Sequence, residues 1–251
     1  MTRTSRAAAR LCAVLAGMAL FCAKAAPPPP PVPAIIQRNY EAALRCYKSN
    51  PLDDQAAWQL GRACFDRAEF PRDNAERARL AEEGIAACSN AVARQPNLAA
   101  AHYYLAMNLA QLARTRWLGA LPLLGRMEKE WKTSLALDEK FDYAGADRNL
   151  GLLYRDSPGW PVSLGDAAKA RRHLLRAVEL SPNLPENHIN LIESHLAWGE
   201  YSAAASAVEK LRRLWPAARK ELTGEYWEDA WKDWTPRLSK IEARLKQKGH
   251  P

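Results

Sequence analysis

The chain repeats one spacing of small, apolar and proline residues four times, and this repetition limits what it can fold into. The last copy runs without a gap from Pro182 to Pro216, 34 residues later. Leu191, Gly199 and Ala204 recur inside it at the spacing of two short helices. Each copy is a helix pair that cannot bury its apolar faces alone, so successive copies must stack. The sequence therefore predicts an all-α chain.

The three earlier copies keep the same order of residues. The first has Ala57, Leu60, Gly61, Cys64, Gly84, Cys88, Ala91 and Pro96; the second has His102, Leu105, Ala106, Leu109, Trp131 and Ser134; the third has Leu150, Gly151, Tyr154, Ala170, Leu174 and Ala177. Their closing positions are 45, 43, 43 and 34 residues apart, which places insertions of 11, 9 and 9 residues between the helices of three copies. This is the tetratricopeptide (TPR) pattern. We expect a TPR solenoid of antiparallel helix pairs over residues 35–216, with about four repeats and a half repeat.

Residues 1–25 have the features of a secretory signal peptide. Three arginines precede a 13-residue apolar run at 11–23, which is too short to span a bilayer, and a small-x-small site follows at 23–25. Lipidation at Cys22 is the less favoured alternative, because Phe21 stands where lipoprotein processing requires a small residue. A proline-rich spacer occupies 26–34. We expect a periplasmic or secreted mature protein without a transmembrane segment.

The net charge of +8 gives little support to a nucleic-acid partner. Four of the 36 basic residues lie in the first 25, which hold no acid, and this leaves 32 basic against 28 acidic residues, or +4. Such a balance is typical of an ordinary solvated surface. We expect no nucleic-acid partner.

Residues 217–251 depart from the repeat pattern. Trp227, Trp231 and Trp234 recur on one helical face, which predicts a capping helix over the last repeat, followed by a basic tail. The alternative is an aromatic face on which a partner docks.

No catalytic motif stands out. The chain has no Walker loop, GxSxG elbow or HExxH, so we expect neither an enzyme nor a cofactor. His188 and His195 occupy core positions of the repeat without an acid or cysteine at ligand spacing, so we expect no metal. A disulfide between Cys64 and either Cys88 or Cys46 is left open.

In a TPR solenoid the first helix of each pair, the A helix, lines the concave groove. The groove positions expected to bind a ligand or partner are Trp58, Arg62, Phe65, Tyr103, Met107, Arg148, Leu152, Arg155 and Ile189, with Glu186 and Glu193 beside the last. This mixture suits an amphipathic ligand or a peptide with a carboxylate, since arginine binds carboxylates in a bidentate manner. Solvated helix faces are the alternative.

Two insertions carry tryptophans that could roof a pocket. Trp117 lies in the apolar segment 112–125, and Trp160 lies in the turn-rich segment 157–166. Asp166 is placed to cap the helix that follows.

The stretch from 144 to 199 carries a family resemblance. The matching residues are Gly145, Ala146, Arg148, Leu150, Gly151, Tyr154, Pro158, Gly159, Pro161, Ser163 and Gly165. This run resembles the T component of TRAP transporters, the TatT family. The resemblance implies a periplasmic TPR protein with a hydrophobic pocket that assists a TRAP-type solute-binding protein, for apolar or amphipathic carboxylates.

Two functions follow from the sequence. One is a non-catalytic, ligand-binding accessory to solute uptake, with a small amphipathic ligand and a solute-binding protein as partners. The alternative is a cell-envelope scaffold that binds a peptide or partner helix in its concave groove. Homo-oligomer formation is left open.

We predict that the exported protein begins at Ala26. The intact mass of protein purified from its native host should match residues 26–251, because the small residues at 23 and 25 fit a signal peptidase. A mass that retains residues 1–25 would contradict export by cleavage, and a lipid adduct on Cys22 would support the lipoprotein alternative.

Overall fold

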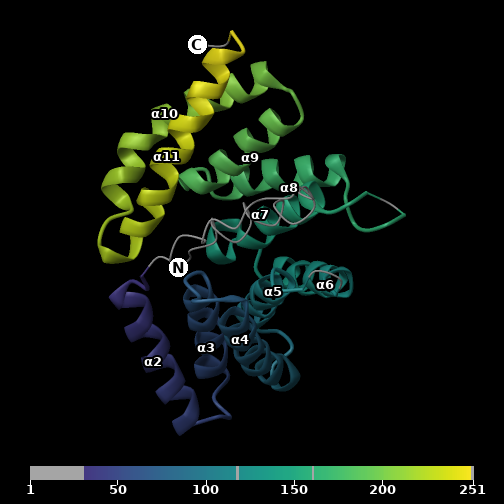
Figure 1. The fold of residues 1–251 in the computed structure, drawn as a ribbon, viewed down its shortest axis with the longest axis vertical. Helices are drawn as coiled ribbons and strands as arrows, with labels where there is room; N and C mark the ends of the chain where they lie inside the picture. Colours follow the sequence, from purple (N-terminus) through teal and green to yellow (C-terminus); the bar gives the residue numbers. More distant parts are fainter. Residues whose placement is uncertain (1–30, 117–118, 160, 250–251) are drawn as a thin grey trace, which may run out of the picture. The chain divides into compact units, whose positions relative to one another are not determined.

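The computed structural model describes residues 31–116, 119–159 and 161–249. These residues form helices connected by short loops, without a β-strand among them (Figure 1). The helices are α2 (Ala34–Ser49), α3 (Asp54–Ala68), α4 (Asn74–Arg94), α5 (Ala99–Ala113), α6 (Leu121–Leu137), α7 (Phe141–Asp156), α8 (Ala167–Leu180), α9 (Pro185–Ala197), α10 (Tyr201–Glu221) and α11 (Glu225–Gln247). No helix of this described part is long and apolar enough to cross a membrane. The expected all-α fold is confirmed, whereas the signal peptide, Trp117 and Trp160 lie outside the described residues.

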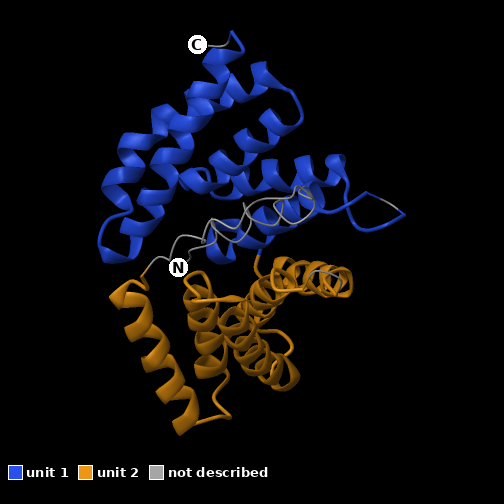
Figure 2. Ribbon diagram, viewed as in Figure 1, with its two compact units in different colours: residues 1–8, 139–251 blue, residues 9–138 orange. Residues whose placement is uncertain are grey.

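The described chain divides into two compact units (Figure 2). Unit 2 contains α2 to α6, and unit 1 contains α7 to α11. Within each unit the helices pack as adjacent pairs, α3 with α4 and α5 with α6 in unit 2, and α7 with α8 and α9 with α10 in unit 1. The A helices α3 and α5 also contact each other, as do α7 and α9.

The helices of a pair approach closely where the repeat supplies a glycine. A Cβ added to Gly61 would lie 2.1 Å from Cys88 Sγ, and one added to Gly151 would lie 2.6 Å from Leu174 Cγ. Real Cβ atoms do not tolerate such distances, so these two positions require glycine for packing. The small residues of the repeat therefore set the spacing between paired helices.

Aspartates begin the helices that follow three of the loops. Asp53 accepts hydrogen bonds from the backbone N–H groups of Gln55 and Ala56, and Asp166 accepts one from Lys169. Asp73 does the same at the start of α4. Capping of α8 by Asp166 is thus confirmed, and each cap satisfies backbone donors that the first helical turn leaves without a partner.

The first insertion lengthens a helix and does not form a long loop. Residues 69–73 alone separate α3 from α4, and α4 extends over 21 residues. In the other two insertions the connecting segments are longer, at 114–120 and 157–166. The repeat spacing could not distinguish these outcomes, because a longer helix and a longer loop displace the next repeat equally.

The C-terminal helices share one apolar core. α10 does not end at Pro216 and continues to Glu221, where Ala218 and Leu222 pack into a cluster with the tryptophans of α11. Trp234 is fully buried, and Trp231 donates from Nε1 to the carbonyl of Leu222 at 2.7 Å. The tryptophan face of α11 is therefore covered by its own unit, as a capping helix requires.

A strained turn begins α7. Asp142, Tyr143 and Ala144 all have positive φ, between 55° and 59°, and form a left-handed turn before the right-handed helix starts. For a residue with a Cβ this conformation costs about 1–2 kcal/mol. Such a turn persists only where neighbouring contacts hold it.

We predict that Gly151→Ala lowers the free energy of unfolding of the mature protein by about 1–3 kcal/mol, because the added methyl would overlap Leu174. Gly125→Ala in α6 is the control, since nothing lies within 4 Å of its added Cβ. The control should stabilise the helix by about 1 kcal/mol. Urea unfolding followed by circular dichroism measures both, and equal effects would contradict the close packing of α7 and α8.

Glycine should relieve the strained turn. Ala144 and Ala146 are both buried in α7, but only Ala144 has positive φ. Both Ala→Gly variants lose the same buried methyl, and we expect Ala144→Gly to be the more stable by about 2 kcal/mol, because glycine favours positive φ and destabilises a right-handed helix. Thermal and urea unfolding measure the stability of both variants. An Ala144→Gly variant less stable than Ala146→Gly would contradict the left-handed turn.

Candidate functional site

The groove residues expected in unit 2 lie on its two A helices. Trp58, Arg62 and Phe65 belong to α3, and Tyr103 and Met107 belong to α5. Phe65, Tyr103 and Met107 are buried, while Trp58 and Arg62 are half-buried. The structure brings the two helices side by side, so these residues come from neighbouring elements of one unit.

Aromatic stacking organises this part of unit 2. Trp58 stacks on Tyr104 with ring centroids 5.8 Å apart and planes 9° from parallel. Tyr103 meets the edge of Tyr104 at 5.1 Å. Arg62 lies 3.9 Å from Asp66 one helical turn further along α3. The result is an aromatic wall with a polar edge, which we call the α3–α5 wall.

The groove residues expected in unit 1 lie on α7 and α9. Arg148, Leu152 and Ile189 are buried, and Arg155 is half-buried. Arg155 binds the carboxylate of Asp156 with two nitrogens, at 2.6 and 2.8 Å, and donates to Ser194 Oγ on α9 at 3.0 Å. Whether these residues bind a ligand stays a prediction. Trp117 and Trp160 lie outside the described residues.

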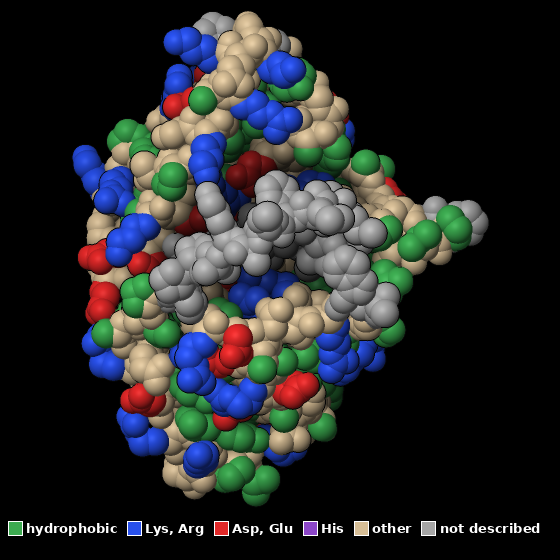
Figure 3. All heavy atoms as spheres, viewed as in Figure 1, with side chains coloured by type: hydrophobic (Ala, Val, Ile, Leu, Met, Phe, Trp, Pro, Cys, Tyr) green, Lys and Arg blue, Asp and Glu red, His purple; other side chains and the backbone are tan. Residues whose placement is uncertain are grey.

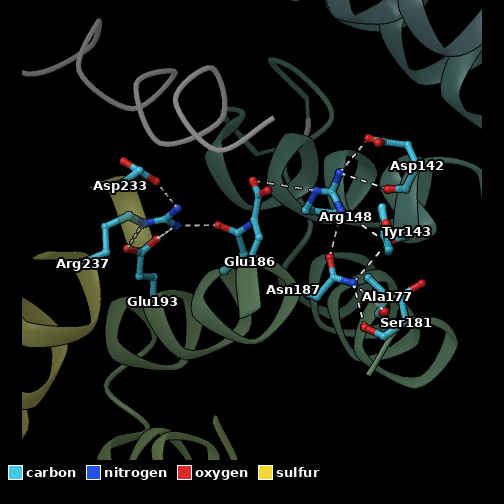
Figure 4. Close-up of polar contacts among 11 residues, drawn as sticks. Asp142, Tyr143, Arg148, Ala177, Ser181, Glu186, Asn187, Glu193, Asp233 and Arg237 are labelled. Carbon is cyan, nitrogen blue, oxygen red and sulfur yellow. Dashed lines mark hydrogen bonds and ion pairs between the residues drawn. The ribbon is translucent and has the colours of Figure 1, made fainter. Parts of the chain in front are cut away.

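Charged and amide side chains connect three helices of unit 1 (Figure 4). We call this set the α7–α9–α11 network, and it consists of Asp142, Arg148, Glu186, Asn187, Asn190, Glu193, Asp233 and Arg237. Glu186, Asn190 and Glu193 recur along α9 at the spacing of one helical face. The network therefore runs across the A helices α7 and α9 and the capping helix α11.

At one end of the network, Arg148 holds the strained turn of α7. Its Nη2 donates to Asp142 Oδ2 at 2.9 Å, and its Nη1 donates to Asn187 Oδ1 at 2.9 Å and to the carbonyl of Tyr143 at 3.3 Å. Asn187 Nδ2 in turn donates to the Tyr143 carbonyl at 3.1 Å and to the Ala177 carbonyl at 2.9 Å. Arg148 and Asn187 thus compensate the left-handed turn with hydrogen bonds.

At the other end, Arg237 joins α11 to α9. It binds both carboxylate oxygens of Glu193, at 2.9 and 2.7 Å, together with Asp233 Oδ2 at 3.1 Å and Asn190 Oδ1 at 2.6 Å. Burial alone would lower the pKa of Arg237, but the hydrogen bonds to Glu193 and the charges of Glu193, Asp233 and Glu186 raise it above its ordinary value. Arg237 is therefore a permanent cation held by carboxylates.

The part of this network that α11 supplies was not predicted from the sequence. Asp233 and Arg237 lie one turn apart on that helix, on the side that meets α9. Both residues are charged and lie on the helix that follows the last repeat, where the next A helix would come. That position could have indicated their role in the sequence. Asn187 and Asn190 were missed as well, because amide side chains on a helix carry no motif.

The described histidines and cysteines are engaged in packing and hydrogen bonds within the fold. His102 Nδ1 lies 2.6 Å from Glu130 Oε2, and this hydrogen bond raises the pKa of His102 against the opposing effect of burial. His188, at the same repeat position, contacts the carbonyl of Pro182, and burial lowers its pKa. Within the described ranges no three His, Cys, Asp or Glu residues are grouped to hold a metal, and the cysteines there form no disulfide.

Unit 1 also has a cavity outside the network. It measures about 420 Å³ and lies between α10 and α11, lined by Val208, Leu245 and the ion pair of Arg212 with Glu242. None of the residues predicted from the sequence lines it. On the face of the described molecule drawn in Figure 3, basic and acidic side chains are interspersed, which is typical of a solvated surface.

The chain is similar to known proteins in part of its sequence and in its fold. A family model described as "Regulator of microtubule dynamics protein 1-3" matches residues 36–116. No curated protein is similar in sequence. Among solved structures, the thermophilic TPR protein TTC0263 of Thermus thermophilus is 19% identical, with a TM-score of 0.62 over 83% of this chain and 91% of that one. MamA is 16% identical, with a TM-score of 0.51 over 72% of this chain and 90% of that one. These similarities show that the chain has the TPR solenoid fold.

Proposed function

We propose that this chain is a non-catalytic TPR scaffold that binds a partner polypeptide along the A-helix faces of its units. The observation that carries the proposal is the α7–α9–α11 network, in which α9 is joined to α7 through Arg148 and to α11 through Arg237, with Glu193 and Asp233 partly exposed at its α11 end. A peptide main chain needs both donors and acceptors along its length, and stacked helices supply them at regular intervals.

The α3–α5 wall gives unit 2 a complementary chemistry. Trp58 and Tyr104 form a stacked pair beside the buried Tyr103 and Met107. Aromatic and thioether groups bind apolar side chains without strict geometry, which suits an interaction scaffold. We propose that unit 2 binds apolar side chains, and that unit 1 binds the polar part of a partner.

The place of action is part of the proposal. The features of residues 1–25 support export, so we propose that the scaffold works in the periplasm or outside the cell. The partner would then be a protein of the cell envelope or a secreted protein.

A second candidate function is ligand handling for a TRAP-type solute-binding protein. The sequence resemblance to the TatT family suggests it, and the α3–α5 wall favours it because an apolar ligand could lie against those rings. Gly165, one of the residues that carry the resemblance, has a packing reason of its own, since an added Cβ would lie 2.2 Å from the Ser157 carbonyl oxygen. Native mass spectrometry with lipid extraction of the mature protein would detect a bound amphiphile.

Site-specific photo-crosslinking tests the scaffold. A photoreactive phenylalanine at Trp58 in α3 or at Arg155 in α7 should capture a discrete polypeptide in the native host, because both positions lie on A helices. The matched controls are Leu137 in α6 and Leu175 in α8, which are exposed on B helices, the second helices of their pairs. Equal capture from A and B helices would contradict the proposal.

A further inference from the structure

We infer that two copies of this chain associate through the outer face of α11, with the two α11 helices antiparallel. We call the residues of this contact the α11 seam, and they are Glu228, Lys232, Thr235, Ser239, Glu242 and Lys246. The inference goes beyond the scaffold function, because it concerns the contact between copies of the chain and not the partner that each copy binds.

The α11 seam is a single stripe along the helix. Its residues follow one another at intervals of 4, 3, 4, 3 and 4 positions, each close to one helical turn, so the six side chains project from one side. Glu242 is half-buried and the other five are exposed, whereas the tryptophans of α11 lie on another face and are buried. The capping helix therefore covers the core with one face and presents a polar stripe with another.

The cavity between α10 and α11 lies beside the second half of the seam. Ser239, Glu242 and Lys246 line it from α11, and Val208 and Arg212 line it from α10. No described helix fills this space of about 420 Å³, and the side chain of Arg212 is 57% exposed. This part of the seam is therefore accessible to another molecule.

The charges of the seam complement one another in the antiparallel direction. When the second copy is turned around, Glu228 lies opposite Lys246, and Lys232 lies opposite Glu242. Each pair occurs twice, because a contact between two identical faces has two-fold symmetry. A parallel arrangement would place every charge opposite the same charge of the other copy, which is unfavourable. The charge order thus favours a second copy and fixes its direction.

Ion pairs within α11 do not account for this charge order. Glutamate followed four residues later by lysine often forms a pair along one helix, and the seam has this spacing twice. The structure instead pairs Lys232 with Asp229 at 3.2 Å and Glu242 with Arg212 of α10 at 2.9 Å. The spacing is therefore not used for pairs inside the helix.

The two ends of the seam carry the charges that a second copy would use first. Glu228 and Lys246 are exposed, and neither forms an ion pair or a side-chain hydrogen bond with another described residue. In the antiparallel arrangement these two residues meet at both ends of the contact. The existing pairs of Lys232 and Glu242 are partly exposed, and such surface pairs are weak enough to be shared with a second copy.

The middle of the seam is small and uncharged. Thr235 of one copy lies opposite Ser239 of the other, and side chains of this size let two helices approach closely. From Glu228 to Lys246 the seam spans about 27 Å of helix. A contact of this length is at the small end of protein interfaces, so we expect a dimer that dissociates on dilution.

Sedimentation equilibrium of the mature protein tests the association with no partner polypeptide present. We expect a monomer–dimer equilibrium between about 10 and 300 µM, the range of a small, transient interface. The equilibrium should shift toward monomer as salt rises, because exposed ion pairs are screened. A monomer at every concentration would overturn the inference.

Charge reversal locates the contact. Lys246→Glu and Glu228→Lys each place like charges at both ends of the seam, so each should weaken the dimer about tenfold. The double variant carrying both substitutions should return to within about twofold of the original affinity, because the pair re-forms in the reverse sense. Lys240→Glu is the control, since it makes the same charge change at an exposed position of α11 outside the seam.

A dimer that Lys246→Glu weakens no more than Lys240→Glu does, or that the double variant fails to restore, would overturn the inference. Circular dichroism of each variant separates loss of the dimer from loss of the fold. Crosslinking from Trp58 and Arg155 is a separate measurement, so a failed scaffold function and a failed dimer can be told apart.

Discussion

Small side chains between the helices of a pair allow those helices to pack closely. This close packing determines which helix faces remain for function. An added Cβ at Gly61 would lie 2.1 Å from Cys88 within the α3–α4 pair, and one at Gly84 would lie 2.4 Å from Asn108 of α5, where the next pair begins. Asn108 uses the space by donating to the carbonyls of Gly61 and Tyr104, both at 2.8 Å. Because the A helix commits one face to this contact, its opposite face is left to line the groove.

In unit 1 the remaining face is polar, and its polar side chains are used to hold a strained turn. The left-handed turn at 142–144 is held by Arg148, a predicted groove residue, and by Asn187 on α9, and both side chains are buried. Arg237 is similarly engaged by Glu193 and Asp233. The basic groups of this face therefore stabilise the fold of unit 1.

Sequence predicted what depends on spacing. The positions of Gly61, Gly151 and Pro182 predicted paired helices because close helix contact allows few residue types there, and Asp166 was recognisable as a cap from its place before α8. The left-handed turn was not predictable, since none of its three residues is glycine and the side chains that hold it lie 5 to 44 residues further along.

Other features could not be predicted from the sequence because they arise from tertiary contacts. Pro216 suggested the end of a repeat, but α10 continues past it because Ala218 and Leu222 are buried with the tryptophans of α11. The groove arginines were correctly placed on the A helices, yet the carboxylate partners of Arg148 come from α7 and α9 and share no motif. The division into two units likewise depends on contacts between helices and not on composition.

Hydrogen–deuterium exchange of the mature protein, with and without the polypeptide that it binds, tests the central claim most directly. Our account predicts slower exchange along the A helices α3, α5, α7 and α9, with α4, α6, α8 and α10 unchanged. Protection confined to the second helices of the pairs would contradict it.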